Sequence, residues 1–141
     1  MTTYQQQAED FLEKACTTMR IVRISKVQGF PFDKKDKHPH IKYQVILTNL
    51  NTGKSYDFPF YDSYANYRDD KRPTSYDVLS AVEKYEVDED IWEFAREFGY
   101  ETETKEDWEM LQRVHRNCLD QYNALLDLFG EDLMKDLQEI V

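Results

Sequence analysis

The architecture of this chain follows from residues 41–60, which read IKYQVILTNLNTGKSYDFPF. Apolar and polar side chains alternate in its first part, where the apolar face consists of Ile41, Tyr43, Val45 and Leu47. An alternation of period two is typical of a strand with one buried face. Residues 49–53, NLNTG, predict a turn, and Tyr56, Phe58 and Phe60 share one face of the alternation that follows. Residues 41–60 therefore predict an antiparallel β-hairpin.

Two further elements are predicted before the hairpin. Residues 19–28 favour a strand that pairs with it, with Val22 and Ile24 on the half-buried face and Arg23 and Ser25 on the other. A short helix is predicted over residues 4–17, because apolar residues recur at helical spacing at Ala8, Phe11, Leu12 and Ala15. Residues 31–39, rich in proline, lysine and aspartate, favour an exposed loop.

Capping signals divide residues 73–141 into helices. Thr74 and Thr104 are each followed three residues later by an aspartate, which is the capping-box spacing. Asp88 is the predicted cap of the helix between them, and Gly99 its end. The buried faces of the first two helices are predicted at Val78, Leu79, Val82 and Tyr85, and at Ile91, Phe94, Ala95 and Phe98. After Gly130, residues 132–141 favour a last short helix.

The long helix that begins at Thr104 carries a heptad pattern. Its apolar positions step by three and four residues through Trp108, Leu111, His115, Cys118, Tyr122, Leu125 and Phe129. Such spacing places these side chains on one seam of the helix. The seam packs inside the domain in one interpretation and forms a homodimer through Leu111, Cys118 and Leu125 in the other.

Together these elements predict an α+β fold, with a small three-stranded antiparallel sheet, an N-terminal helix and a helical C-terminal half. Residues 1–141 are expected to form a single domain, since no segment rich in glycine, serine or proline marks a linker. Residues 1–72 supply the helix and sheet, and residues 73–141 an acidic helical half.

Charge is distributed unevenly along the chain, whose net charge is −10. Residues 20–72 hold eleven Lys/Arg and six Asp/Glu, a net +5, whereas residues 73–141 hold six Lys/Arg and nineteen Asp/Glu, a net −13. An acidic surface disfavours phosphate binding and favours a basic partner. The candidate partner-binding residues are Glu86, Asp88, Glu89, Asp90, Glu93, Glu97, Glu101, Glu103 and Glu106.

The basic middle of the chain supports an alternative. Aromatic residues interleaved with lysine and arginine can stack the bases of a single strand and neutralise its phosphates. The candidate residues for nucleic-acid binding are Lys54, Tyr64, Tyr67, Arg68, Lys71 and Arg72.

Catalytic and metal-binding patterns are weak. Cys16 and Cys118 are far apart in the sequence and are expected to be buried thiols in a reducing compartment. His115 and Cys118 share a helix face, but zinc usually takes four ligands in close pairs. The sequence contains neither a phosphate-binding glycine motif nor Gly-x-Ser-x-Gly. We therefore expect no metal, no cofactor and no enzymatic activity.

Three segments resemble a group of small acidic accessory proteins carried by bacteriophages and mobile elements of Gram-positive and gut bacteria. They are YDFPFYDSYAN at 56–66, RPTSYDVL at 72–79 and EFGYET at 97–102, and the resemblance spans about residues 40–140. Because phage proteins of this kind are often inhibitors of host defence, the resemblance implies an anti-CRISPR or anti-restriction setting. It carries over no functional residue.

Charge and resemblance together predict a phage-encoded, non-catalytic inhibitor of a host defence complex, of the anti-CRISPR kind, that binds a basic nucleic-acid-handling surface through acidic helices. The alternative is a small nucleic-acid-binding accessory protein that uses the basic hairpin and the Tyr-rich loop. The sequence has neither a long apolar run nor the features of a signal peptide, so we expect the host bacterial cytoplasm as its location.

Overall fold

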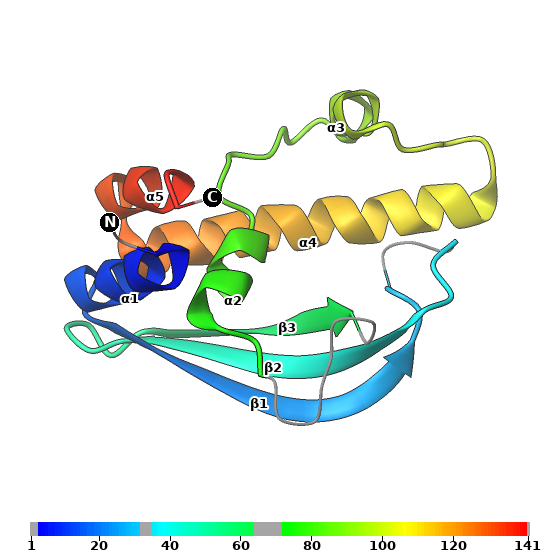
Figure 1. Ribbon diagram of the computed structural model, residues 1–141. Coiled ribbons are helices and arrows are strands. Elements are labelled where there is room, and N and C mark those ends of the chain that lie inside the picture. The colour runs from blue at the N-terminus through cyan, green and yellow to red at the C-terminus, as the bar shows by residue number, and fades with distance from the viewer. Residues whose placement is uncertain (1–2, 32–34, 64–71, 141) are drawn as a thin grey trace.

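The computed structural model describes residues 3–31, 35–63 and 72–140. It confirms the predicted α+β fold, with an N-terminal helix, a three-stranded antiparallel sheet and a helical C-terminal half (Figure 1). In chain order the elements are α1 (Tyr4–Lys14), β1 (Thr17–Gln28), β2 (Pro39–Asn49), β3 (Ser55–Ser63), α2 (Ser75–Ala81), α3 (Ile91–Phe98), α4 (Lys105–Phe129) and α5 (Glu131–Gln138). None of the helices in these described ranges is both long and apolar enough to cross a membrane.

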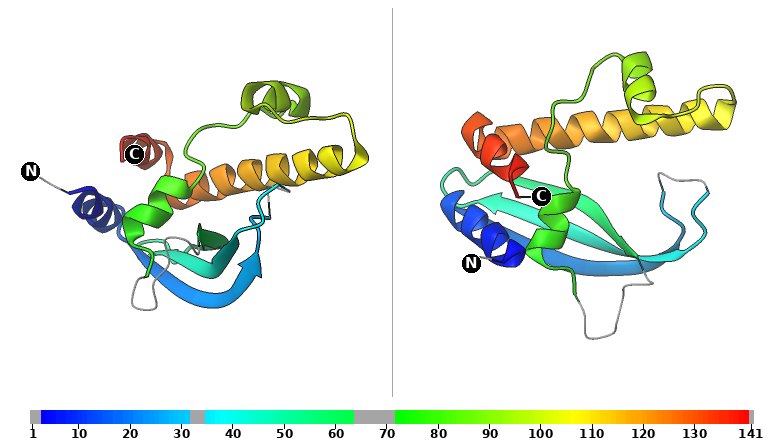
Figure 2. Two further views of the ribbon diagram at one scale, coloured as in Figure 1. Left: turned by 45° about the vertical axis from the view of Figure 1, so that its right-hand side comes forward. Right: turned by 45° about the horizontal axis from the view of Figure 1, so that its top comes forward.

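The sheet has the strand order β1-β2-β3, with β2 in the centre and both pairings antiparallel. The four apolar side chains predicted for the inner face of β2 are all buried, which confirms the alternation in residues 41–48. The helices of the described residues all lie on one side of the sheet (Figures 1 and 2). This is the arrangement that a strand pattern with one apolar face requires.

The predicted inner face of β1 is wrong. Val22 pairs with Gln44 and Ile24 is 53% exposed, whereas Met19 and Ile21 pack against the core. The register shifts between Arg23 and Ser25, because Ile24 is an extra residue without a partner in β2. Such a β-bulge bends the strand and changes which side chains face inward. The hydrophobic residues of β1 therefore do not follow a single period of two.

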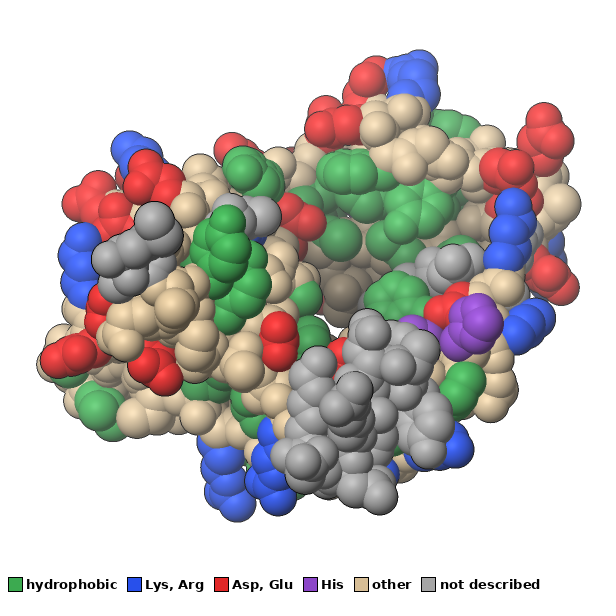
Figure 3. Space-filling model, viewed as in Figure 1, with side chains coloured by type: hydrophobic (Ala, Val, Ile, Leu, Met, Phe, Trp, Pro, Cys, Tyr) green, Lys and Arg blue, Asp and Glu red, His purple; other side chains and the backbone are tan. Residues whose placement is uncertain are grey.

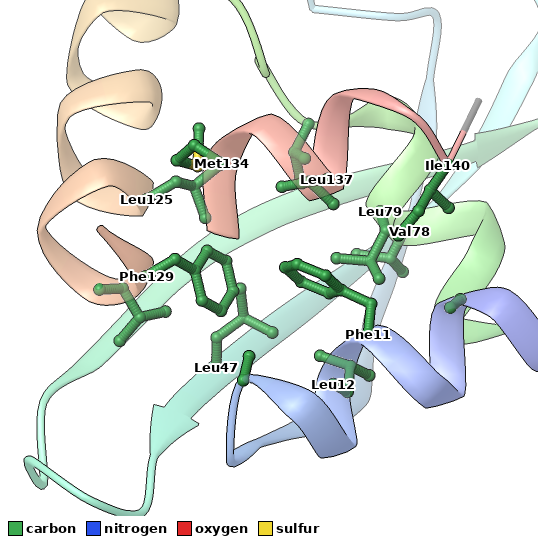
Figure 4. Close-up of a cluster of buried hydrophobic side chains, with 14 of the residues drawn as sticks. Phe11, Leu12, Leu47, Val78, Leu79, Leu125, Phe129, Met134, Leu137 and Ile140 are labelled. Atoms are coloured by element: carbon green, nitrogen blue, oxygen red, sulfur yellow. The ribbon is translucent and has the colours of Figure 1, made fainter. Parts of the chain in front are cut away.

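The principal core lies between the sheet and helices α1, α2 and α5, together with the C-terminal half of α4. Figure 4 shows Phe11 and Leu12 of α1 facing Phe129, Leu137 and the sheet. We call the buried hydrophobic residues of this core the main cluster. They are Ala8, Phe11, Leu12, Ala15, Val45, Leu47, Phe58, Val78, Leu79, Val82, Leu125, Leu128, Phe129, Met134, Leu137 and Ile140.

The predicted caps of α2 and α4 are present. The hydroxyl of Thr74 accepts the amide of Asp77 and the Asp77 carboxylate accepts the amide of Thr74, while Thr104 accepts the amide of Asp107. The cap of α3 is Asp90 rather than Asp88: its carboxylate accepts the amides of Trp92 and Glu93. The carboxylate of Asp88, two residues before the cap, instead accepts the amide of Asp90.

Two residues predicted to be buried are exposed. Helix α2 ends at Ala81, where Val82 becomes extended, so Tyr85 lies beyond it and is 58% exposed. On α3, Phe98 is 55% exposed although Phe94 and Ala95 are buried as predicted. Both exposed aromatic side chains belong to the region that carries the acidic residues, which gives them a place in the candidate site.

A second, smaller cluster joins α3 to the N-terminal half of α4. Its buried residues are Val87, Phe94, Ala95, Leu111 and Val114. Helix α3 lies on the side of α4 opposite the sheet, so α4 separates the second cluster from the main cluster (Figures 1 and 2). Among the heptad positions, Leu111 and Leu125 are fully buried within the chain, one in each cluster. The heptad thus packs inside the fold, and the predicted homodimer would need a surface other than these two leucines.

Candidate functional site

All nine carboxylates predicted to bind a partner are exposed. They lie between residues 86 and 106, on the chain before α3, on α3 itself, on the connection to α4 and, for Glu106, in the first turn of α4. We call residues 86–106 the acidic segment. Figure 3 shows acidic side chains over α3 and along the connection that leads to α4. The sequence prediction therefore identified one segment of the chain whose nine named carboxylates are all exposed.

Three side chains fix the chain that leads into the acidic segment, although residues 82–90 form neither helix nor strand. The Nε2 of His115 donates to the carbonyl oxygen of Asp88 at 2.7 Å. The side chain of Gln121 accepts the amide of Glu83, and that of Gln138 donates to the carbonyl of Lys84 at 2.7 Å. These partners on α4 and α5 satisfy backbone groups that a strand or helix would otherwise satisfy. None of these three contacts was predicted, and the one sequence feature that could have indicated the bond to Asp88 is the polar His115 in an otherwise apolar seam.

Local interactions use part of the acidic charge. The Asp90 carboxylate caps α3, where the helix dipole stabilises a negative charge. Glu93 forms an ion pair with Arg96 one turn later on α3. Both groups remain exposed, so these contacts hold the carboxylates in place without removing them from the surface.

Exposed aromatic side chains accompany the carboxylates. Tyr85, Trp92 and Phe98 are each more than half exposed, and the ring of Trp92 lies 5.0 Å from that of Trp108. Large exposed apolar side chains inside a polar rim are typical of protein-binding surfaces, where aromatic residues supply much of the binding energy. The surface thus combines apolar anchors with a negative rim.

A cavity of about 480 Å³ lies at the start of this surface, between the end of α2 and the end of α3. Its walls include the apolar side chains of Val82, Tyr85 and Phe98 and the carboxylates of Glu83 and Glu97. Its volume is in the range of small-ligand sites. Because Glu97 also belongs to the acidic segment, the cavity and the exposed carboxylates form one continuous site.

Two residues that line the cavity, Glu83 and Lys84, have pKa values shifted from their ordinary values. Burial raises the pKa of Glu83, and the nearby Glu97 raises it further, whereas the amide of Tyr85 and the charge of Lys84 oppose this. Lys84 is only 4% exposed, and its Nζ has no hydrogen-bond acceptor in the described part of the chain. Burial lowers the pKa of the Lys84 ammonium despite the attraction of Glu83. An ammonium left without an acceptor is costly to bury.

Replacing Lys84 by methionine is expected to raise the free energy of unfolding at pH 7 by about 1–3 kcal/mol, because an unsatisfied buried donor disappears. Folding lowers the pKa of Lys84 below 10.5, so between the folded and unfolded pKa values the unfolded chain holds more protons than the folded chain. The free energy of unfolding of the wild type therefore rises with pH over that interval. The advantage of Lys84→Met should shrink accordingly. Urea unfolding at pH 7 and pH 10 measures both effects, and the exposed Lys135→Met is the control. Equal stability of Lys84→Met and wild type at pH 7 contradicts the prediction.

The alternative nucleic-acid site is only partly within the described residues. Tyr64, Tyr67, Arg68 and Lys71 lie outside them. Lys54 lies in the turn between β2 and β3, where its Nζ is 3.0 Å from the carboxylate of Asp127 on α4. Arg72 is exposed immediately before α2. The structure therefore shows Lys54 paired with an acidic residue and does not bring it together with Arg72.

The remaining candidates for chemistry have structural partners. Burial raises the pKa of the Cys118 thiol to about 11, with a contribution from Glu83, so this cysteine is a poor nucleophile at neutral pH. Near the start of β2, His40 forms a pair at 2.7 Å with Asp36, which lies in the loop before the strand. Within the described residues, no group of three or more histidine, cysteine or acidic side chains could hold a metal ion.

No protein-family model matches this sequence, and no curated protein or solved structure is significantly similar to it.

Proposed function

We propose that this protein is a non-catalytic, phage-encoded inhibitor of a host defence complex, of the anti-CRISPR kind, and that it binds a basic nucleic-acid-handling surface of that complex through the acidic segment. The observation that carries the proposal is the exposure of all nine predicted carboxylates on one segment. The uneven charge of the sequence supports it, because residues 73–141 carry a net charge of −13.

The acidic segment suits this role because it is held in place before binding. The contacts of Asp88 with His115, and of Glu83 and Lys84 with two glutamines, anchor the chain to α4 and α5. A preorganised surface loses little conformational entropy when it binds. Its carboxylates would meet the lysine and arginine residues that otherwise contact phosphates, and so prevent nucleic acid from entering.

A phage-plaquing assay tests the proposal. The chain is expressed in bacteria that carry an active CRISPR system, and the cells are challenged with a targeted phage. Plaque formation is expected to return to the level of a non-targeted phage in at least one CRISPR type. If plaques are restored in none of the CRISPR types tested, the anti-CRISPR assignment is rejected.

A binding assay with the purified effector of the responding type follows. The protein should bind it after nuclease treatment and should bind more weakly as salt rises, since exposed charges are screened. Binding that disappears with nuclease, together with binding to a free single-stranded oligonucleotide, would instead support the nucleic-acid-binding alternative.

A further inference from the structure

Two exposed aromatic side chains line the cavity between the end of α2 and the end of α3. Tyr85 and Phe98 are each more than half exposed, whereas Val82 and Val87, which line the same cavity, are buried. The two rings therefore supply most of the apolar surface that a ligand could cover. Covering such surface with another apolar group is favourable, because it removes apolar area from water.

The walls of the cavity are held in place before any ligand binds. The amide of Glu83 donates to the side-chain oxygen of Gln121, and the carbonyl of Lys84 accepts the side-chain amide of Gln138 at 2.7 Å. On the α3 side, the ring centroid of Phe98 lies 4.8 Å from that of a buried phenylalanine of the second cluster. A site that is already formed loses little conformational entropy when it binds.

The charge at the cavity selects the kind of partner. Glu86 and Glu97 are exposed, Glu83 is half-buried, and all three line the cavity. Within residues 3–31, 35–63 and 72–140, none of the three forms an ion pair with a lysine, arginine or histidine. Carboxylates repel phosphates, so nucleic acid and anionic lipid headgroups are unsuitable ligands. A protein segment that carries lysine or arginine is complementary to this charge.

We infer that this cavity binds one large apolar side chain of a protein partner, and that lysine or arginine residues flanking it in the partner contact Glu86 and Glu97. The inference rests on the proposed function, because it specifies how the basic surface of the target is recognised. It adds an apolar anchor to a surface that otherwise acts through distributed charge.

The cost of burying charge assigns the apolar group to the cavity and the cations to its rim. A cation taken into the cavity would lose its water, and an ion pair formed there gains little beyond this desolvation cost. Beside the exposed Glu86 and Glu97 the same cation stays in contact with water. An apolar side chain has no such cost, and packing between Tyr85 and Phe98 gives it the covered aromatic contact that dominates the energetics of protein interfaces.

Three capped peptides test the inference, each titrated into the full chain and followed by amide chemical shifts. They are acetyl-Gly-Lys-Lys-Leu-Lys-Lys-Gly-amide, a counterpart with serine in place of leucine, and a counterpart with glutamate in place of every lysine. The leucine peptide should shift the resonances of residues 82–87 and 97–98 and bind at least about fivefold more tightly than the serine peptide. The glutamate peptide should bind at least about tenfold more weakly than the leucine peptide. Equal affinity for leucine and serine, or no shift in these residues, overturns the inference.

Two matched variants on α3 locate the apolar contact. Phe98 and Trp92 are each slightly more than half exposed, but Phe98 lines the cavity and Trp92 does not. Phe98→Ser should weaken the leucine peptide at least about fivefold and remove its advantage over the serine peptide, whereas Trp92→Ser should change affinity by about twofold or less. Tyr85→Ser repeats the test at a residue outside the helices, so its result does not depend on the stability of α3. Equal losses in Phe98→Ser and Trp92→Ser would reject the pocket.

A paired change of charge tests the rim. Combining Glu86→Gln with Glu97→Gln should weaken both lysine peptides about tenfold and leave the preference for leucine intact. Combining Glu101→Gln with Glu103→Gln makes the same change in net charge outside the cavity, and should weaken them by about twofold or less. Equal losses in the two pairs would assign the attraction to net charge and reject the contact at the rim.

A second copy of the chain is the competing occupant. Sedimentation velocity of the wild-type protein should give a monomer, since a symmetric dimer through this cavity would bring two acidic segments together. A dimer that Phe98→Ser abolishes would make a second copy the occupant and would overturn the inference.

These results are separable from the plaquing assay. If Phe98→Ser selectively weakens the leucine peptide but the wild-type chain restores no plaques, the pocket stands and the proposed function fails. If plaques return while Phe98→Ser and Trp92→Ser behave alike toward the peptide, the function stands and the pocket fails.

Discussion

Affinity for the defence complex is expected to fall by about 100-fold or more when Glu89, Glu101 and Glu103 are all replaced by lysine. These residues are exposed, lie in connections rather than helices, and have no capping role. Asp90 is unsuitable for the test, because loss of its cap on α3 would itself cost about 1 kcal/mol of stability. Like charges placed against a basic surface cost several kcal/mol, so plaque restoration should be lost together with affinity.

A matched control separates this effect from net charge. Replacing Glu9, Glu13 and Asp120 by lysine produces the same change in charge at exposed positions on α1 and α4, outside the acidic segment. Affinity measured by calorimetry or surface plasmon resonance should fall far less in this control. If both triple variants lose affinity equally, net charge rather than the acidic segment governs binding.

Leu125→Ala is expected to lower the free energy of unfolding by about 2–5 kcal/mol. Leu125 is fully buried in the main cluster, close to Met134 and Phe129 (Figure 4), and truncation would leave a cavity among well-packed neighbours. Leu50→Ala removes the same atoms at a position that is 64% exposed, and should cost about 0.5 kcal/mol or less. Urea unfolding followed by circular dichroism measures both variants.

Protein concentration distinguishes this effect from loss of a dimer. The loss in Leu125→Ala should be the same over a wide range of concentration, because Leu125 packs against its own chain. A dilution-dependent midpoint that Leu125→Ala abolishes would place this residue at an interface between copies, contrary to the structure.

The fold was predictable where a local pattern and its environment agree. The hairpin at residues 41–60 has a simple alternation, and Thr74 and Thr104 form local bonds with the aspartates three residues later. The predictions were wrong where contacts between residues far apart in the sequence determine the local structure. The bulge at Ile24 appears only once β1 pairs with β2, and Tyr85 becomes exposed because α2 ends at Ala81.

The candidate site divides in the same way. Exposure of the acidic residues followed from their charge, since ionised carboxylates are seldom buried without partners. The bond from His115 to Asp88 joins residues 27 positions apart, and the cavity combines the end of α2 with the end of α3. No local pattern reports such contacts. Lys84 is the extreme example, because a lysine among glutamates is expected at the surface and is instead buried.

The division of buried side chains by α4 has a consequence for motion. The main cluster is large and includes the sheet, whereas the second cluster consists of Val87, Phe94, Ala95, Leu111 and Val114. Fewer buried contacts mean a lower free energy of local opening, so amide hydrogens of α3 should exchange with solvent well before those of β2. Helix α3 can thus detach and dock again while the sheet stays intact. A partner that holds α3 against α4 would slow this exchange. The exchange rate of the α3 amides would therefore show whether a partner is bound to the acidic segment.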